Sequence, residues 1–250
     1  MDGFQLNQTR PTTITNSLRI VNGDIVPADN SDFFFLVTLV RLEEDGSLTV
    51  FCGGAILRPD VVITAYHCFE GEDLSKVFIR PNYDNTINDI PLELYYGISR
   101  VSYREEADIN DICLVFLDTL LELSERIGSI SLPSEEIEDG TSVYIMGFGQ
   151  LWFNGPISMQ LRVARLIKQR DFLCSQFWYT LFHADRQFCT SGLMGEDSCK
   201  GDSGGPLVAM EGNKLVIVGV VAFGLECSSY FGVNMKVLAY VDWIQILLYM

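Results

Sequence analysis

Short apolar runs separated by polar clusters recur along the chain from Ile20 onward. Turn-forming stretches such as "EEDG", "RPNYDN" and "FNGP" lie between them. Apolar runs of this length, bounded by Gly, Pro, Asn and Asp, favour β-strands over helices. Many strands with few helical stretches indicate an all-β fold of antiparallel barrels or a sandwich. Strands are expected at residues 33–40, 48–52, 61–65, 76–80, 112–117, 143–146, 161–167, 206–210 and 215–223.

The last segment of the chain departs from this pattern. In "AYVDWIQILLYM", the apolar residues Val241, Ile244, Leu247 and Leu248 recur at helical spacing. This spacing predicts a terminal helix that packs on the body of the protein. A membrane anchor is the alternative, but the segment is shorter than the ~20 residues that a spanning helix needs.

Residues 1–19 are polar, rich in Thr, Asn and Gln, and offer little to bury, so we expect a flexible leader. The opening "MDGFQLNQTR" lacks the basic and apolar regions of a signal peptide. Either the secretion signal has been removed from this chain or export uses another route. Asn7 begins a glycosylation sequon, which is meaningful only if the chain is secreted.

Charge narrows the range of partners. The 250-residue chain carries a formal net charge of −16, so it repels nucleic acids and anionic membranes and attracts cations. No motif supports a nucleic-acid or carbohydrate binder on a β scaffold. The acidic surface has a second interpretation, in which it only keeps a secreted protein soluble.

The seven cysteines indicate an oxidising compartment. They form no CxxC pairs, so a zinc site is not expected. Three disulfides and one leftover thiol fit the count, and Cys113, inside the apolar run "ICLVFL", is expected to be the buried free thiol. Residues 70–90 contain no convincing calcium loop, so we expect no metal and no cofactor.

Three short segments carry the residue types of nucleophilic catalysis. "TAYHC" contains His67, "NDICLVFL" contains Asp111, and "GDSGGP" contains Ser203. A serine hydroxyl is a weak nucleophile until a base takes its proton. An imidazole can do this near neutral pH, and a buried carboxylate fixes its tautomer and stabilises the imidazolium. The three residues are far apart in the sequence, so only folding can bring them together.

The motifs "RIVNG", "TAYHC", "NDICLVFL" and "DSCKGDSGGP", in this order, make the chain resemble the trypsin-like serine proteases of the chymotrypsin family. The resemblance covers about nine-tenths of the chain. It implies two six-stranded antiparallel β-barrels with a C-terminal helix and an active site between the barrels. Residues 20–250 would form the peptidase domain, and residues 1–19 a propeptide.

The resemblance also assigns roles around Ser203. The backbone N–H groups of Gly201 and Ser203 would form an oxyanion hole, where glycine permits an unusual backbone. Cleavage between Arg19 and Ile20 would free an α-amine that pairs with Asp202 and orders this hole. The uncut chain would then be a zymogen, activated by itself or by an upstream protease.

Further implied features concern the disulfides and the substrate pocket. The resemblance pairs Cys52 with Cys68, Cys174 with Cys189, and Cys199 with Cys227. It places Asp197 at the floor of the primary pocket, assisted by Ser198, with Gly224 and Gly232 as open walls. An acid at this floor selects Arg or Lys at the cleaved position. Asp108 and Glu226 would extend a basic preference upstream, or are only solvated charges.

Several positions depart from the family pattern without removing a catalytic group. Ala222 replaces a serine that supports the catalytic aspartate, and Phe223 replaces a tryptophan of the pocket wall. Tyr66 replaces a small residue, and Phe231 and Asn234 replace other usual residues near the pocket. A lost hydrogen bond at position 222 would cost about 0.5–1.5 kcal/mol, which lowers turnover without abolishing it.

The resulting expectation is a secreted serine endopeptidase that cleaves after Arg or Lys. Its partners would be protein or peptide substrates and protein protease inhibitors, with no nucleic acid and no membrane. The alternative is a catalytically weak or silent homologue that acts as an adaptor in a protease cascade.

Overall fold

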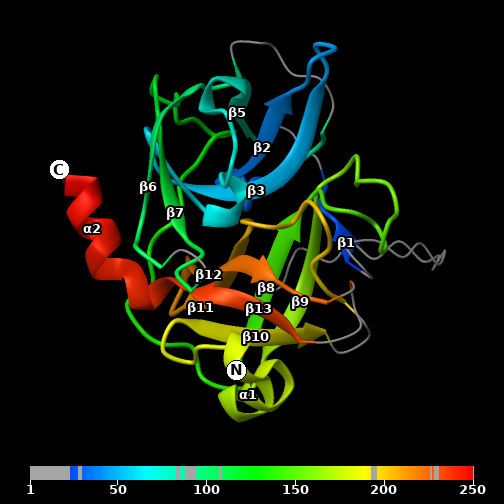
Figure 1. Ribbon diagram of the computed structural model, residues 1–250, viewed down its shortest axis with the longest axis vertical. Helices are drawn as coiled ribbons and strands as arrows, with labels where there is room; N and C mark the ends of the chain where they lie inside the picture. Colours follow the sequence, from blue (N-terminus) through cyan, green and yellow to red (C-terminus); the bar gives the residue numbers. More distant parts are fainter. Residues whose placement is uncertain are drawn as a thin grey trace.

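The computed structural model describes residues 23–27, 30–82, 85–87, 94–106, 109–192, 196–225, 227 and 231–249. Within these residues the chain forms two antiparallel β-sheets that lie one above the other in Figure 1. The leader, Asn7, the Arg19–Ile20 bond, Asp108 and Glu226 lie outside the described residues.

The first sheet contains six strands in the order β5-β2-β3-β4-β7-β6. A bridge between Ile79 in β5 and Tyr96, just before β6, brings its two edges together, so the sheet curls into a barrel. The strands are β2 (Leu36–Leu42), β3 (Leu48–Arg58), β4 (Val61–Thr64), β5 (Val77–Pro81), β6 (Ile98–Tyr103) and β7 (Cys113–Leu117).

The second sheet closes on itself. Its order is β1-β9-β10-β13-β12-β11-β8, and β8 also pairs with β9, so six strands form a ring to which β1 is added. The strands are β1 (Asp24–Ile25), β8 (Ser142–Gly147), β9 (Arg162–Lys168), β10 (Gln187–Gly192), β11 (Pro206–Glu211), β12 (Lys214–Phe223) and β13 (Gly232–Lys236). The prediction of an all-β fold with two six-stranded barrels and a C-terminal helix is confirmed.

In the described residues, two α-helices lie on the outside of the barrels. The α-helices are α1 (Asp171–Trp178), at the lower end of Figure 1, and α2 (Val241–Tyr249), along its left side. Short 3-10 turns are η1 (Tyr66–Cys68), η2 (Leu74–Lys76), η4 (Tyr179–Leu181) and η5 (Val237–Tyr240). Ile244 anchors α2 in the core, as its apolar spacing predicts. Of the helices in the described residues, none has the length and apolarity to cross a membrane.

Every strand predicted from an apolar run is present, but four strands were missed. β6, β10, β13 and the two-residue β1 lack such runs. In β10 and β13 the reason is physical: they bury polar side chains that bond to each other, as Asn234 Nδ2 does with Thr190 Oγ1 at 3.0 Å. Burial of polar groups that satisfy one another is favourable, but it leaves no hydrophobic pattern in the sequence.

One continuous hydrophobic core joins the two sheets. It includes Leu39 and Ile63 of the first sheet together with Val208, Ile217 and Val220 of the second. A second core cluster lies inside the second barrel alone. The shared core fixes how the two barrels pack against each other. It therefore also positions the residues at the seam, which is the surface along which the two barrels meet.

Candidate functional site

His67 and Asp111 form a hydrogen-bonded pair at one end of the first sheet. Strands β4 and β7 are antiparallel neighbours in which Thr64 lies opposite Cys113. His67 follows β4 in η1, and Asp111 precedes β7, so both residues emerge at the same end. His67 Nδ1 lies 2.7 Å from Asp111 Oδ2, and the His67 backbone N–H donates to Asp111 Oδ1 at 2.8 Å. The imidazole is thus held in one orientation by a largely buried carboxylate.

Ser203 reaches this pair from the second sheet, in the loop that precedes β11. Its carbonyl oxygen accepts a 2.8 Å hydrogen bond from the Gly53 backbone N–H in β3 of the first sheet. The sulfur of Cys68 lies 3.8 Å from His67 Nε2 and 3.9 Å from the Ser203 carbonyl oxygen. The structure therefore brings Ser203 close to His67, although within the described residues its hydroxyl makes no hydrogen bond to the imidazole.

The loop before Ser203 has the geometry expected of an anion site. Gly201 has φ +95°, a conformation that favours glycine. The Lys200 carbonyl accepts a 2.7 Å hydrogen bond from the Gln150 N–H, and in a trans peptide the Gly201 N–H must point the opposite way. Across the described part of the chain, neither the Gly201 N–H nor the Ser203 N–H donates to another group. Both amides are thus available to a negatively charged oxygen.

Asp202, between these two residues, is buried, and its hydrogen bonds within the described residues all come from backbone amides. The Gly149 N–H donates to Oδ1 at 2.9 Å and the Cys199 N–H donates to Oδ2 at 3.0 Å. No cationic side chain of the described residues contacts it. Burial raises the pKa of Asp202 from 3.8 to about 7, opposed by the two amide bonds and reinforced by the charge of Asp197. The site thus favours a neutral carboxyl until a cation arrives.

A cavity of about 280 Å³ opens beside Ser203. Asp197 lies on its lining and is buried, with Oδ1 accepting from the Ser198 N–H at 2.8 Å and from the Ser198 hydroxyl at 3.4 Å. Gly224 lines the cavity, and a Cβ on Gly232 would lie 3.3 Å from Asp197 Oδ1. A side chain at position 232 would therefore occupy the space next to the carboxylate. Of the four residues that the resemblance assigned to the primary pocket, Asp197, Ser198 and Gly224 line this cavity, and Gly232 lies next to Asp197.

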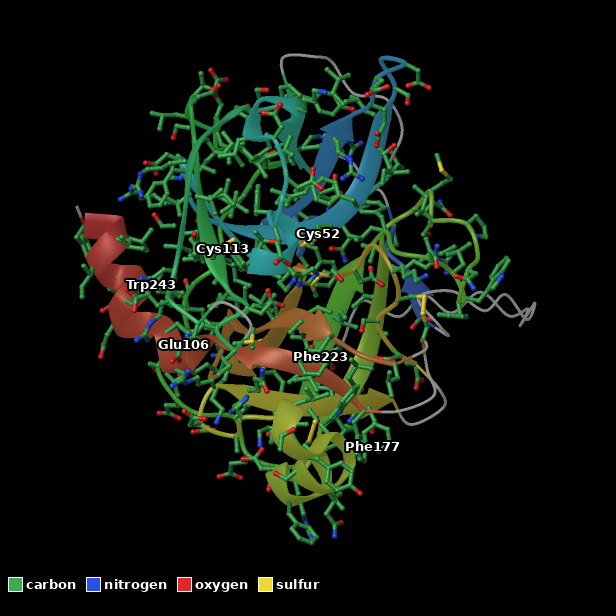
Figure 2. All side chains as sticks on the ribbon, in the orientation of Figure 1. Cys52, Glu106, Cys113, Phe177, Phe223 and Trp243 are labelled. Carbon is green, nitrogen blue, oxygen red and sulfur yellow. A yellow bond between two sulfur atoms is a disulfide. The ribbon has the colours of Figure 1, made fainter. Side chains whose placement is uncertain are left out.

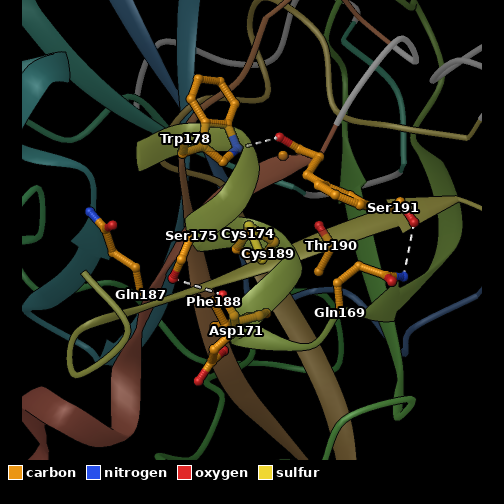
Figure 3. Close-up of a disulfide and its surroundings, with 12 residues drawn as sticks. Gln169, Asp171, Cys174, Ser175, Trp178, Gln187, Phe188, Cys189, Thr190 and Ser191 are labelled. Atoms are coloured by element: carbon orange, nitrogen blue, oxygen red, sulfur yellow. Dashed lines mark hydrogen bonds between the residues drawn. A yellow bond between two sulfur atoms is a disulfide. The ribbon is translucent and has the colours of Figure 1, made fainter. Parts of the chain in front are cut away.

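The disulfides join Cys52 to Cys68, Cys174 to Cys189, and Cys199 to Cys227. These are the pairs that the resemblance implied. The second ties α1 to β10 (Figure 3), and the third holds the Ser198–Lys200 segment to the far wall of the cavity. Cys113 is the buried free cysteine, and burial raises the pKa of its thiol well above the usual range.

Cys52, His67 and Cys68 place three possible metal ligands close together. Both sulfurs are consumed in a disulfide, so this group offers a metal only the imidazole. Figure 2 shows Cys52 and Phe223 near the middle of the molecule, on the two sides of the seam.

Sequence reasoning missed three contributors to the site. Phe153 and Lys200 line the cavity, and the Lys200 ammonium lies 5.2 Å from the Phe153 ring centroid. Gly53 supplies the amide that binds the Ser203 carbonyl. Phe153 belongs to a loop, and Lys200 occupies a motif position without a fixed residue type. Gly53 is a glycine within a strand. No sequence signal marked any of the three.

Two of the departures from the family pattern, at positions 222 and 223, line the cavity. Ala222 is buried on the cavity lining, and in the described residues Asp111 receives hydrogen bonds only from His67. Phe223 forms part of the wall and packs edge-on against Trp178, with ring centroids 5.1 Å apart. Phe223 keeps an aromatic wall, whereas Ala222 brings no hydroxyl to the cavity lining.

Comparison with known proteins agrees with this geometry. The family model described as Trypsin matches residues 20–244. The chain is 31% identical to chymotrypsin-C of Bos taurus, over 91% of this chain and 88% of that protein. It is 29% identical to the proclotting enzyme of Tachypleus tridentatus, and 27% identical to venom serine protease 34 of Apis mellifera. These two alignments each cover 92% of this chain but only 66% and 58% of the relatives' own lengths. The match over most of the chain shows that this protein belongs to the trypsin family of serine proteases.

Proposed function

We propose that the protein is a serine endopeptidase that cleaves proteins or peptides after Arg or Lys. The observation that carries this proposal is the His67–Asp111 hydrogen bond of 2.7 Å next to Ser203, at the mouth of a cavity lined by Asp197. The relatives include a chymotrypsin-C and a proclotting enzyme, so family membership alone does not define which bond is cleaved. The choice of Arg or Lys therefore rests on Asp197.

In the proposed reaction His67 acts as the base. Nε2 takes the hydroxyl proton of Ser203 while Oγ attacks the carbonyl carbon of the scissile bond, and Asp111 stabilises the resulting imidazolium through Nδ1. The negative oxygen of the tetrahedral intermediate is bound by the Gly201 and Ser203 amides. His67 then returns the proton to the leaving amine, and the C–N bond breaks to leave an acyl-serine. Water, activated by the same imidazole, hydrolyses this ester and restores Ser203.

Specificity would come from charge at the bottom of the cavity. A guanidinium or ammonium group can pair with the Asp197 carboxylate, and Ser198 offers a further oxygen. A substrate with an apolar side chain would take this buried carboxylate out of water without a cation, a penalty worth about a hundredfold or more in kcat/KM. Gly224 and Gly232 leave the room that a long side chain needs.

Activation by cleavage between Arg19 and Ile20 is part of the proposal. The new α-amine would pair with Asp202, which is buried without a cationic side chain in the described residues. The bond to be cut follows an arginine, so the protein could activate itself or be activated by a similar protease. Residues 1–19 would be the propeptide, and protein inhibitors of serine proteases would be additional partners. Three disulfides are typical of an oxidising compartment, which supports secretion.

The direct test compares the chain before and after cleavage at Arg19. We expect the cut protein to hydrolyse an arginine p-nitroanilide peptide at least about a hundredfold faster than the matched phenylalanine peptide. A serine-directed sulfonyl fluoride should label Ser203, and the Ser203→Ala variant should be inactive and unlabelled. A cut protein that neither hydrolyses any of these peptides nor reacts at Ser203 would instead be a silent homologue with an adaptor role.

A further inference from the structure

Asn110, the residue before Asp111, connects three separate segments through its side chain. The residue is buried. Its Nδ2 donates to the Glu105 carbonyl at 2.6 Å, and its Oδ1 accepts from the Tyr240 hydroxyl at 3.0 Å and from Arg186 Nη1 at 3.3 Å. Glu105 belongs to the loop after β6 in the first half of the chain. Tyr240 in η5 and Arg186 just before β10 belong to the second half, so these bonds cross the seam between the barrels.

A second hydrogen bond also crosses the seam, but here the first half of the chain holds a residue of the second half. The Gly53 amide in the first sheet holds the carbonyl of Ser203, which the second sheet carries. Asn110 is the counterpart: groups of the second half hold the residue that precedes Asp111. Each half of the molecule thus fixes the reactive segment of the other half.

Asp111 depends on its backbone for position. Its carboxylate receives two hydrogen bonds in the described residues, both from His67. The backbone on either side is tightly bonded, because the Asn110 N–H donates to the Glu106 carbonyl at 2.9 Å and the Ile112 N–H donates to the Asn110 carbonyl at 2.7 Å. A shift of Asn110 would therefore move the carboxylate and the imidazole together, away from Ser203.

We propose that Asn110, Tyr240 and Arg186 form a positioning network. The network holds the Asp111–His67 pair at the right distance and orientation from Ser203, which lies across the seam. The inference rests on the proposed function, because it assigns the network a role in the same reaction. None of the three residues touches the reacting atoms, so their effect would pass through the placement of Asp111. The loss of one such contact should lower turnover without changing the binding of the substrate's cationic side chain, because the network shares no residue with the cavity lining.

The donors of the network are well suited to hold one geometry. Tyr240 is 1% exposed, and burial raises the pKa of its hydroxyl to about 12, so it remains a donor throughout the neutral range. Its ring packs on Trp243 of α2 with centroids 6.4 Å apart. Arg186 is restrained by Asp185 at 3.1 Å and by Glu106 at 3.8 Å. Figure 2 shows Glu106 beside the base of the helix that carries Trp243, which is where the two halves meet.

Tyr240→Phe tests the proposal, because it removes only the hydroxyl. Tyr96→Phe is the matched control: Tyr96 is also a buried tyrosine whose hydroxyl bonds to the Glu122 backbone, but both residues belong to the first half of the chain. On the cut protein we expect Tyr240→Phe to lower kcat about two- to tenfold with KM for the arginine peptide unchanged. The rate of Ser203 labelling by sulfonyl fluoride should fall by the same factor, and the inhibition constant of benzamidine should stay constant. Tyr96→Phe should change none of these quantities.

Arg186→Met provides a second variant at a partly exposed position, where folding is not at risk, and it should lower kcat in the same direction. Circular dichroism and thermal unfolding would establish that each variant is folded. Equal kcat and labelling rates in Tyr240→Phe, Arg186→Met and the parent would overturn the positioning role, as would parallel changes in KM and benzamidine binding. If the parent protein itself neither hydrolyses the peptide nor reacts at Ser203, the proposed function fails instead, so the two failures are distinct.

Discussion

The buried carboxyl of Asp202 should make the uncut chain less stable as pH rises towards about 7. Its pKa is raised from 3.8 to about 7 by burial, so in the folded chain the carboxyl stays neutral up to about pH 7. The unfolded chain ionises near its ordinary value. A raised folded-state pKa contributes stability that is fully present below pH 3.8 and is lost as pH rises through about 7. The gap of about three pKa units corresponds to about 4 kcal/mol of unfolding free energy.

The measurement is urea unfolding at 25 °C, followed by tryptophan fluorescence between pH 4 and pH 8. The parent carries Ser203→Ala so that it stays uncut, and the comparison variant adds Asp202→Asn, which cannot ionise. Other carboxyl groups titrate equally in both proteins and cancel in the difference. The Asn variant should gain about 4 kcal/mol relative to the parent between pH 4 and pH 8, most of it by pH 7. A difference that stays flat, or that falls with pH, would refute the account of Asp202.

In the cut chain the effect of Asp202→Asn on stability should have the opposite sign. An α-amine has an ordinary pKa of about 7.7–8.0, and pairing with Asp202 would raise this pKa and keep the carboxylate ionised. The stabilisation would be present below pH 8 and lost as pH rises through the raised amine pKa. In the cut protein Asp202→Asn should therefore destabilise at pH 7, and a stabilising effect there would argue against the amine as partner.

Three further substitutions test the site. Asp197→Asn should lower kcat/KM for the arginine peptide by about a hundredfold or more, because the cation loses its charged partner; an unchanged value would place recognition elsewhere. Gly201→Ala should lower kcat by about 10²–10³, since φ +95° is unfavourable for alanine and a Cβ would lie 3.2 Å from Gly149 Cα, so the amide should shift; full activity in steady-state kinetics would mean that the positive φ of Gly201 is not needed to place its amide. Ala222→Ser should raise kcat up to about tenfold, if position 222 lies near Asp111 as the family resemblance implies and the new hydroxyl donates to it, and a loss of activity would mean that the site has no room for it.

Local pattern predicts most strands of this fold, but not their pairing. The run "VVIT" and the run "CLVFL" both indicate buried strands, and both are present as β4 and β7. Nothing in the two runs states that Thr64 lies opposite Cys113, which is the register that places His67 beside Asp111. The three reactive residues could be named because their motifs resemble a known family. The polar strands β10 and β13 escaped prediction because their buried Gln187, Thr190 and Asn234 break the apolar alternation.

The glycines of the motif around Ser203 lie where the two barrels meet. A short sequence motif therefore marks a site that is formed by packing between distant segments. A Cβ on Gly53 would lie 3.0 Å from Gly205 Cα, so the two barrels meet here backbone against backbone. Gly204, with φ +74°, has no room for a side chain either, because its Cβ would lie 2.2 Å from Thr64 Oγ1 and 2.8 Å from the Gly53 carbonyl. The glycines after Ser203 therefore serve the close approach that lets the Gly53 amide bind the Ser203 carbonyl. A side chain at Gly53 or Gly204 would force the barrels apart and carry Ser203 away from His67, and a Cβ on Gly205 would lie 2.8 Å from the Asp202 carbonyl oxygen. This is why the serine of this site stands among glycines.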